Sequence, residues 1–314
     1  MAFVRVPGNP EPAGIEELWF EGRDGLKIRA AWAPAVGAPR GSVILCPGRT
    51  EFIEKYFEVI GEIQRRGFCV FTIDWRGQGL SGRPLPNPMK GHLESLDHAV
   101  SDLAAGLKLV GDKLPRPHVM VAHSMGGGIG LRALQTRRVE VDAAIFSAPM
   151  WGIMALNKWG LRFSRFMAAI GSGGTFAPGS ATVWRKEPFK KNPVTHDRNR
   201  HARQQALIMA EPRLALGGPT LGWVVAAADG FDGFEQPGAL AHLRIPIIVC
   251  SAGEEALVAN EAHEIIASHL PNAKHVTIAG AKHEIMQETD DVRAQFFAYF
   301  DELTASLTPQ RAMA

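Results

Sequence analysis

The sequence has only three cysteines, Cys46, Cys69 and Cys250, and no two of them have the spacing of metal ligands. All three fall in segments predicted to be strands, so we expect buried free thiols in a reducing compartment. No apolar run reaches the ~20 residues that a membrane-spanning helix needs. The first residues also lack the basic and apolar regions of a secretory signal. These absences favour a cytoplasmic protein.

Net charge is also small, because 34 Lys and Arg face 32 Asp and Glu, which leaves +2. Such a balance gives no reason to expect nucleic acid as a partner. The distribution is uneven, since residues 149–235 contain eleven Lys and Arg but only six Asp and Glu. The middle of the chain is therefore electrostatically distinct from both ends.

Strand and helix patterns alternate along most of the chain. The segments at 41–48 and 68–75 are almost continuously apolar, which is typical of strands buried on both faces of a parallel sheet. Residues 15–20 and 26–34 flank a turn-rich pentapeptide and predict an antiparallel pair. The whole pattern predicts an α/β fold, with a mostly parallel sheet and helices on both of its faces.

Residues 149–235 interrupt this alternation. They carry no strand pattern and are rich in aromatic residues, methionine and basic residues. We therefore predict that residues 1–148 and 236–314 form two parts of one core. Residues 149–235 would form a helical insertion after the sixth main strand.

The clearest chemical signal is VMVAHSMGGGIGLRAL at 119–134, which carries a serine between a strand pattern and a helix pattern. A sharp strand–serine–helix turn needs small flanking residues. Ala122 and Gly126 occupy the places of the two glycines in the G-x-S-x-G motif of such turns. Ser124 would then be a nucleophile exposed at the turn. The alternative is that Ser124 only caps the helix.

A serine nucleophile needs a base, and the base needs an acid that orients it. His283 follows the last predicted strand and is the candidate base, because histidine titrates near neutral pH. The acid should follow the preceding strand, where Glu254 and Glu255 are adjacent. In sites of this kind the acid commonly stands before x-x-Val, which favours Glu255 and leaves Glu254 as the alternative.

Acyl transfer passes through an oxyanion, which two N–H donors stabilise. Met125, directly after the nucleophile, supplies one candidate donor. Arg49, which follows the Pro47-Gly48 turn after an early strand, supplies the other. The order serine, glutamate, histidine along the chain, each after its own strand, is the order found in α/β-hydrolases.

These stretches resemble the monoacylglycerol lipase and bacterial lysophospholipase group of α/β-hydrolases. The resemblance covers most of the chain outside 149–235 and is carried by CPGRTEFIEKYFEVIGEIQRRGFCVFTIDWRGQGLSGR, GHLESLDHAVSDL, VAHSMGGGIG, FSAPMWGI, AGEEALVAN and GAKHEIMQE. It implies the α/β-hydrolase fold, with an eight-stranded sheet and a helical cap inserted after strand 6. Relatives usually have His-Gly where this chain has Pro47-Gly48, so the packing beneath the donor Arg49 should differ.

The resemblance also implies a role for each candidate. Ser124 matches the nucleophile, His283 the base and Glu255 the acid, while Arg49 and Met125 match the residues whose backbone N–H groups form the oxyanion hole. The implied reaction is hydrolysis of a carboxylic ester in a single-chain lipid, either a lysophospholipid or a monoacylglycerol, without a metal or other cofactor. A general carboxylesterase or an aminopeptidase-like amidase is the alternative, and a non-catalytic ligand-binding protein is the remote one. Headgroup preference and oligomeric state stay open.

In enzymes of this group the cap shapes the acyl pocket, and Trp151 and Trp223 are candidates for its lining. The stretch 149–171 is basic and amphipathic. It either packs on the core as a lid or lies peripherally on the inner face of an anionic membrane. Residues 184–204 hold seven Lys and Arg, which either form a solvated face or attract phosphate headgroups.

Overall fold

The computed structural model describes residues 3–22 and 24–307. Its central sheet consists of β1 (Glu16–Glu21), β2 (Lys27–Ala33), β3 (Gly41–Cys46), β4 (Phe68–Ile73), β5 (His118–His123), β6 (Ala143–Ser147), β7 (Ile247–Ala252) and β8 (Ala273–Ile278). The α-helices are α1 (Phe57–Arg65), α2 (Leu96–Val110), α3 (Met125–Gln135), α4 (Lys158–Met167), α5 (Arg198–Ala210), α6 (Leu221–Glu235), α7 (Asn260–Ser268) and α8 (Asp290–Ala305). Shorter helical turns are η1 (Ile53–Tyr56), η2 (Gly111–Lys113), η3 (Ala168–Ser172), η4 (Phe189–Lys191), η5 (Pro212–Leu214) and η6 (Ile285–Gln287).

The strands lie in the order β1-β2-β4-β3-β5-β6-β7-β8. β1 pairs with β2, and β2 with β4, in antiparallel fashion, whereas every later pair is parallel. All residues of β3, β4, β6 and β7 are buried, as expected for strands covered on both faces. The predicted mostly parallel sheet and its antiparallel pair are therefore confirmed.

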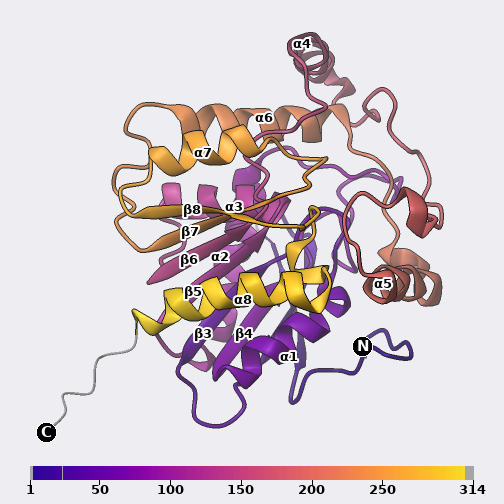
Figure 1. The fold of residues 1–314 in the computed structure, drawn as a ribbon. Helices are drawn as coiled ribbons and strands as arrows, with labels where there is room; N and C mark the ends of the chain where they lie inside the picture. Colours follow the sequence, from indigo (N-terminus) through magenta and orange to yellow (C-terminus); the bar gives the residue numbers. More distant parts are fainter. Residues whose placement is uncertain (1–2, 23, 308–314) are drawn as a thin grey trace, which may run out of the picture.

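The helices cover the sheet in two groups (Figure 1). α1 and α8 lie together on one side, where Arg66 Nε donates to Asp301 Oδ1 at 2.8 Å. α2, α3 and α6 contact one another on the other side, and α7 lies beside α6. α1 turns one apolar face to the sheet, with Val59, Ile60 and Ile63 buried, so helical periodicity explains its placement.

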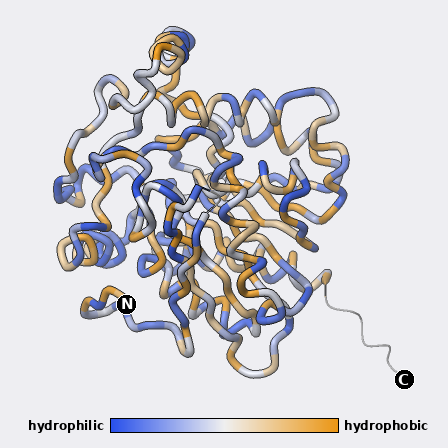
Figure 2. Tube along the Cα trace, turned by 180° about the vertical axis from the view of Figure 1, so that it is seen from behind, coloured by the Kyte–Doolittle hydropathy of each residue, from blue (hydrophilic) through white to orange (hydrophobic). Residues whose placement is uncertain are grey.

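The segment between β6 and β7 contains α4, α5 and α6 and contributes no strand to the sheet within the described residues. Its last helix, α6, contacts α2, α3 and α7, whereas α4 contacts α6 and lies at the outer edge of the molecule (Figures 1 and 2). The limits 149–235 for a cap stay a prediction. We use "the insertion" for residues 149–235 below.

The three cysteines are buried and free, in β3, β4 and β7, as predicted. Burial raises the pKa of the Cys46 and Cys250 thiols well above the usual range, so these thiols stay protonated. No described helix combines the length and the apolar character needed to cross a membrane.

Candidate active site

Ser124 occupies the turn between β5 and α3 with φ 49° and ψ −119°, a conformation that L-residues rarely adopt. The glycines after it are needed for close approach. A Cβ on Gly126 would lie 2.3 Å from the carbonyl oxygen of Cys46, and one on Gly127 would lie 2.6 Å from Cβ of Pro149. Ser124 makes no side-chain capping bond to α3, so the geometry does not support the cap alternative.

The structure brings Ser124, His283 and Glu255 together from three different strand ends. His283 Nδ1 lies 2.8 Å from Glu255 Oε2, and His283 Nε2 lies 2.9 Å from Ser124 Oγ. An ionised carboxylate can only accept, so Nδ1 carries the proton of the neutral ring. Nε2 is then the acceptor for the Ser124 hydroxyl, which is the arrangement that a general base requires.

Glu255 is held in place by three backbone N–H groups. Its Oε1 accepts from Ala256 at 2.9 Å and Leu257 at 2.8 Å, and more weakly from Val258 at 3.4 Å. Burial alone would raise the pKa of Glu255, but the hydrogen bond and charge interaction with His283 and these N–H donors outweigh it and lower the pKa. Glu255 is therefore ionised at neutral pH.

Glu254, the alternative acid, points elsewhere. Its Oε2 lies 3.2 Å from His196 Nε2, and its side chain is 56% exposed, against 2% for Glu255. The two adjacent glutamates thus occupy opposite environments, and only Glu255 contacts His283.

The N–H groups of the two candidate oxyanion donors have no hydrogen-bond acceptor among the described residues. Met125 is the first residue of α3, so its N–H has no intrahelical partner. The N–H of Arg49 makes no hydrogen bond to any described residue. Both groups are available for an anionic oxygen beside Ser124.

The Pro47-Gly48 turn is fixed by side chains that the sequence had not singled out. Trp75 Nε1 donates to the carbonyl of Pro47 at 2.7 Å, and Gln78 Nε2 donates to that of Gly48 at 2.7 Å. The N–H of Gly48 donates to Glu51 Oε2. These three bonds hold the turn before Arg49 with proline at position 47.

A buried ionic chain links this turn to the loop of the base. Lys55 Nζ lies 2.8 Å from Glu51 Oε1 and 2.6 Å from Glu284 Oε1, and Glu284 directly follows His283. Glu51 also accepts from the Tyr56 hydroxyl at 2.6 Å. Charged side chains usually lie in solvent, so nothing in the sequence indicates that Glu51 and Lys55 are buried.

A cavity of about 360 Å³ opens over Ser124 and His283. Its walls are mostly apolar and come largely from the insertion and from the loop after β7: Met150, Ile153, Ala155, Val194, Pro219, Trp223, Ala256, Leu257 and Val258. Trp223 lies where it was predicted, on the wall. Its Nε1 contacts Met125 Sδ at 3.4 Å.

Trp151 does not line this cavity, which corrects its assignment from the sequence. Its side chain is 1% exposed, donates from Nε1 to the carbonyl of Gly127 at 3.2 Å and packs against Phe146 and His263. The indole N–H thus has an acceptor and the ring has apolar and aromatic neighbours outside the cavity. The nearby Met150 and Ile153 line the cavity instead.

No group of three or more His, Cys, Asp or Glu placed to hold a metal occurs in the described part of the chain.

The chain is similar to several known proteins in sequence and in fold. Residues 37–290 match the family described as Hydrolase_4, serine aminopeptidase S33. The chain is 33% identical to lysophospholipase L2 of Escherichia coli K12, over 89% of this chain and 84% of that protein. It is 26% identical to the monoacylglycerol lipase of Mycolicibacterium smegmatis, over 86% and 91% of the two chains. The solved monoglyceride lipase of Saccharomyces cerevisiae, a soluble variant bound to a substrate analog, superposes with a TM-score of 0.72 at 20% identity, over 99% and 100% of the two chains, which confirms the α/β-hydrolase fold.

Proposed function

The chain belongs to the serine aminopeptidase S33 family of α/β-hydrolases, and on that premise we propose that it cleaves carboxylic esters of single-chain lipids through an acyl-enzyme. Family members similar to it are named lysophospholipase and monoacylglycerol lipase, which are carboxylic ester hydrolases. The observation that carries the proposal is the pair of contacts from Glu255 to His283 and from His283 to Ser124, at 2.8 and 2.9 Å.

In the first half of the reaction, Ser124 Oγ attacks the ester carbonyl carbon while its proton passes to His283 Nε2. The ring becomes an imidazolium, and the ionised Glu255 at Nδ1 stabilises its charge. The carbonyl oxygen becomes an oxyanion, which the N–H groups of Arg49 and Met125 receive. Collapse of this intermediate transfers the Nε2 proton to the departing glycerol oxygen and leaves the acyl group on Ser124.

In the second half, a water molecule takes the place of the alcohol. His283 Nε2 removes its proton, the hydroxide oxygen attacks the acyl carbon, and the fatty acid leaves as Ser124 Oγ regains a proton. The same two N–H groups stabilise the second oxyanion. No residue beyond these five is needed to balance protons and charge.

The apolar wall of the cavity supports a lipid substrate. A ligand pocket of this size with mostly apolar lining suits an acyl chain. We take the insertion, which supplies Met150, Ile153 and Trp223, to act as the cap over this chain.

An amidase that recognises a free amino terminus is less well supported. Such an enzyme needs a carboxylate in the cavity for the substrate ammonium group. The two cavity-lining glutamates that do not belong to the triad, Glu51 and Glu284, are both paired with Lys55. Neither is free for that purpose.

The surface of α4 supports contact with a lipid surface. Trp159, Phe163 and Phe166 of α4 are exposed, with Trp159 at 78%, and so is Ile170 in the turn that follows. Of the two alternatives for this stretch, packing on the core therefore does not hold for these residues. Lys158 and Arg162 lie on the same helix and would favour anionic lipids. The insertion would thus rest on the membrane from which the substrate comes.

A fluorophosphonate probe and a matched pair of glutamate variants test the mechanism. Ser124→Ala should lose all labelling and all ester hydrolysis, because the nucleophile is gone. Glu255→Gln should lower kcat/KM by about 10³- to 10⁴-fold, because an amide neither fixes the tautomer nor stabilises the imidazolium.

The neighbouring variant Glu254→Gln is the control and should stay within about twofold of the wild type, because Glu254 is exposed and contacts only His196. Labelling that persists in Ser124→Ala would refute the nucleophile. Equal losses in the two glutamate variants would refute the assignment of the acid.

A further inference from the structure

The side chain of Arg49 is the feature of the site that the mechanism leaves unused, since only its backbone N–H is needed there. Its Nη2 donates to the carbonyl of Gly217 at 2.7 Å, and its Cζ lies 5.4 Å from the ring centre of Trp223. Both contacts come from the end of the insertion. They leave most of the hydrogen-bonding capacity of the guanidinium unused.

Arg49 has no acidic partner. Within residues 3–22 and 24–307, no Asp or Glu lies within ion-pair distance of it, and its Nε and Nη1 make no hydrogen bond. Two other arginines with buried side chains have acidic partners: Arg29 pairs with Glu54 and Asp74, and Arg76 pairs with Asp102. Burial lowers the pKa of Arg49 to about 10, so it is still protonated at neutral pH.

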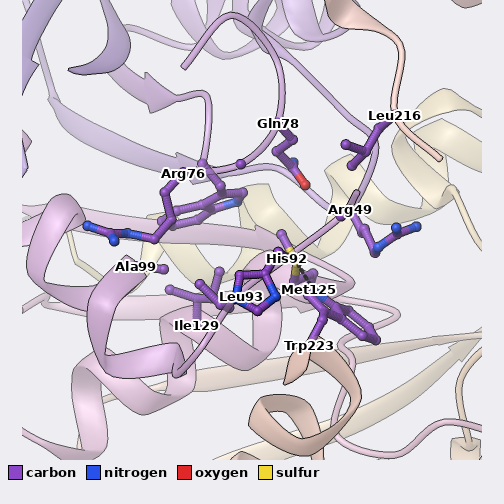
Figure 3. Close-up of a pocket in the computed structure, with 13 residues that line it drawn as sticks. Arg49, Arg76, Gln78, His92, Leu93, Ala99, Met125, Ile129, Leu216 and Trp223 are labelled. Carbon is purple, nitrogen blue, oxygen red and sulfur yellow. Dashed lines mark hydrogen bonds between the residues drawn. The ribbon is translucent and has the colours of Figure 1, made fainter. Parts of the chain in front are cut away.

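Arg49 is one of the residues that line the catalytic cavity over Ser124, together with Trp223. The same two residues also line a much smaller pocket of about 10 Å³ (Figure 3). A Cβ on Gly91 would lie 2.2 Å from Arg49 Nη2, so glycine at this position makes room for the guanidinium. An uncompensated positive charge is therefore built into the wall of a pocket that is otherwise mostly apolar.

We propose that the Arg49 side chain binds the phosphate of a lysophospholipid while the ester lies at Ser124, an inference that rests on the function proposed above. A guanidinium with unpaired N–H groups suits a phosphodiester, which would neutralise it through charge-assisted hydrogen bonds. A monoacylglycerol offers only hydroxyl groups and leaves the charge uncompensated. Arg49 thereby determines specificity for an anionic headgroup.

The spacing between the ester and the phosphate of a lysophospholipid matches the length of the Arg49 side chain. In a lysophospholipid, the three glycerol carbons and one oxygen separate the ester oxygen from phosphorus. In Arg49, three methylene groups and Nε separate Cα from Cζ. One residue can therefore meet the carbonyl oxygen with its backbone N–H and the phosphate with its side chain.

The test compares lysophosphatidylcholine with the monoacylglycerol of the same acyl chain in one detergent micelle system. The quantity measured is the ratio of the two kcat/KM values, so any general effect on the oxyanion turn cancels. Arg49→Met should lower the ratio by about 10- to 100-fold, the range for a lost hydrogen bond to a charged group. Arg49→Lys keeps the positive charge but lacks the planar guanidinium, so its ratio should lie between those of Arg49→Met and the wild type.

Arg213→Met is the matched control, because Arg213 is an exposed arginine that pairs with Glu211 and lines neither pocket. Its ratio should equal that of the wild type. Glycerophosphocholine should inhibit monoacylglycerol hydrolysis by the wild type and lose this effect in Arg49→Met. Inorganic phosphate that inhibits as strongly as glycerophosphocholine would overturn the assignment to a lipid headgroup.

An unchanged ratio in Arg49→Met would overturn the proposal, and so would an equal loss of both activities, which would show that Arg49 only fastens Gly217. These results leave the proposed function intact if Ser124→Ala is inactive. Hydrolysis of both lipids by Ser124→Ala would instead refute the proposed function itself.

Discussion

Helices α4 and α5 belong to the same insertion and carry three Lys or Arg side chains each, yet these side chains lie in opposite surroundings. On α5, two of the arginines are bound to the core. On α4, the one arginine with acidic partners contacts only α6, and the apolar side chains around it are exposed. The insertion is therefore fastened at one helix and free to meet other surfaces at the other.

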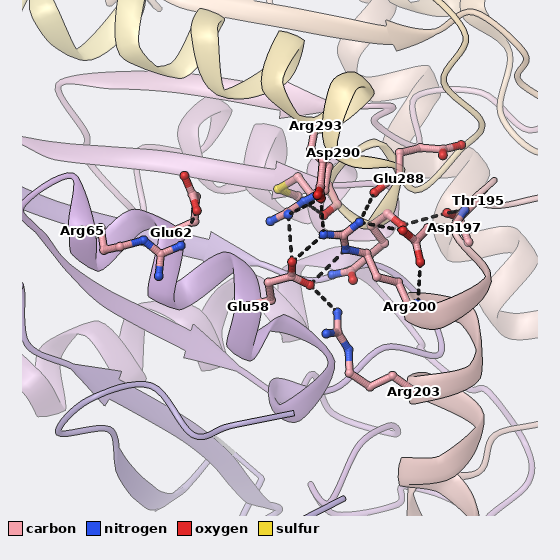
Figure 4. A network of polar contacts seen from close by, with 12 residues as sticks. Glu58, Glu62, Arg65, Thr195, Asp197, Arg200, Arg203, Glu288, Asp290 and Arg293 are labelled. Carbon is pink, nitrogen blue, oxygen red and sulfur yellow. Dashed lines mark hydrogen bonds and ion pairs between the residues drawn. The ribbon is translucent and has the colours of Figure 1, made fainter. Parts of the chain in front are cut away.

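The attachment of α5 is a cluster of ion pairs around Glu58 of α1 (Figure 4). Arg200 contacts Glu58 through Nη2 at 2.5 Å and Nε at 3.0 Å, Arg203 contacts it at 2.6 Å, and Arg293 of α8 contacts it at 2.9 Å. Arg200 also donates to the carbonyl of Glu288 at 2.8 Å. Three guanidinium groups from two helices, α5 and α8, thus share one carboxylate of α1.

Amino-acid composition does not distinguish the paired basic side chains of α5 from the exposed ones of α4. Residues 184–204 have a basic surplus that could attract phosphate headgroups, but the Arg200 and Arg203 charges are already neutralised by the core. The charges on α4 are fewer than in that segment but stand among exposed aromatic rings. A basic count in the sequence therefore does not say which charges remain available for a lipid.

The largest expected effect comes from removing the carboxylate that fastens α5. Glu58→Gln removes the one carboxylate that Arg200, Arg203 and Arg293 share, although Asp197 and Asp290 still pair with Arg200. We expect the free energy of unfolding to fall by about 2–3 kcal/mol, below the cost of breaking a fully buried pair because Glu58 is 28% exposed. Urea unfolding measures this difference.

The control for α4 is Asp232→Asn, which removes one partner of Arg165. Both side chains are largely exposed, so the expected loss is at most about 0.5 kcal/mol. Equal losses in the two variants would show that the helices are fastened alike and would remove the contrast between them.

The contribution of Glu58 to the free energy of unfolding should depend on pH. Burial alone would raise the pKa of Glu58, but the hydrogen bonds from Arg200 and Arg203 and the charge of Arg293 lower it to about 2. Because this pKa lies below the ordinary 4.5, the ionised carboxylate stabilises the fold above pH 4.5, and the contribution is lost as the pH falls towards 2.

The stability gap between the wild type and Glu58→Gln should therefore be constant above about pH 5 and narrow below it. Denaturant unfolding at a series of pH values measures the gap. A gap that does not change down to pH 3 would mean that the ion pairs at Glu58 do not produce it.

The sequence predicted the fold well because the signals are local. Continuous apolar runs identify buried strands such as β3 and β4, and turn residues identify the β1–β2 pair. Strand order and the partners of α5 depend on contacts between distant segments, such as Glu58 with Arg200, which periodicity does not encode.

The sequence identified the three residues that the structure brings into contact at the candidate site. It did not identify the side chains that hold the neighbouring turn in place. Ser124, Glu255 and His283 each follow a strand, and the ends of parallel strands meet at one edge of the sheet. Trp75 and Gln78, which hold the Pro47-Gly48 turn, come from the loop after β4, and their side-chain directions follow only from the assembled fold. For the same reason Trp151 was misplaced: adjacent residues in the loop after β6 face opposite ways.

The smallest expected effect concerns α4 and its exposed ring at Trp159. Trp159→Ala removes the most exposed aromatic side chain of the helix and leaves its number of charged residues unchanged. We expect the partition onto vesicles of phosphatidylcholine and phosphatidylglycerol to weaken about 10-fold, because an indole is a strong interfacial anchor. Co-sedimentation at fixed ionic strength measures the change, and urea unfolding should show little loss of stability.

Leu109→Ala is the matched control, because Leu109 is also exposed but lies on α2, outside the insertion. If α4 is the helix that meets the lipid, this variant should bind vesicles as the wild type does. Equal weakening in both variants would mean that apolar surface anywhere on the molecule drives binding. Undiminished binding by Trp159→Ala would mean that α4 does not enter the bilayer, so its exposed rings would need another partner.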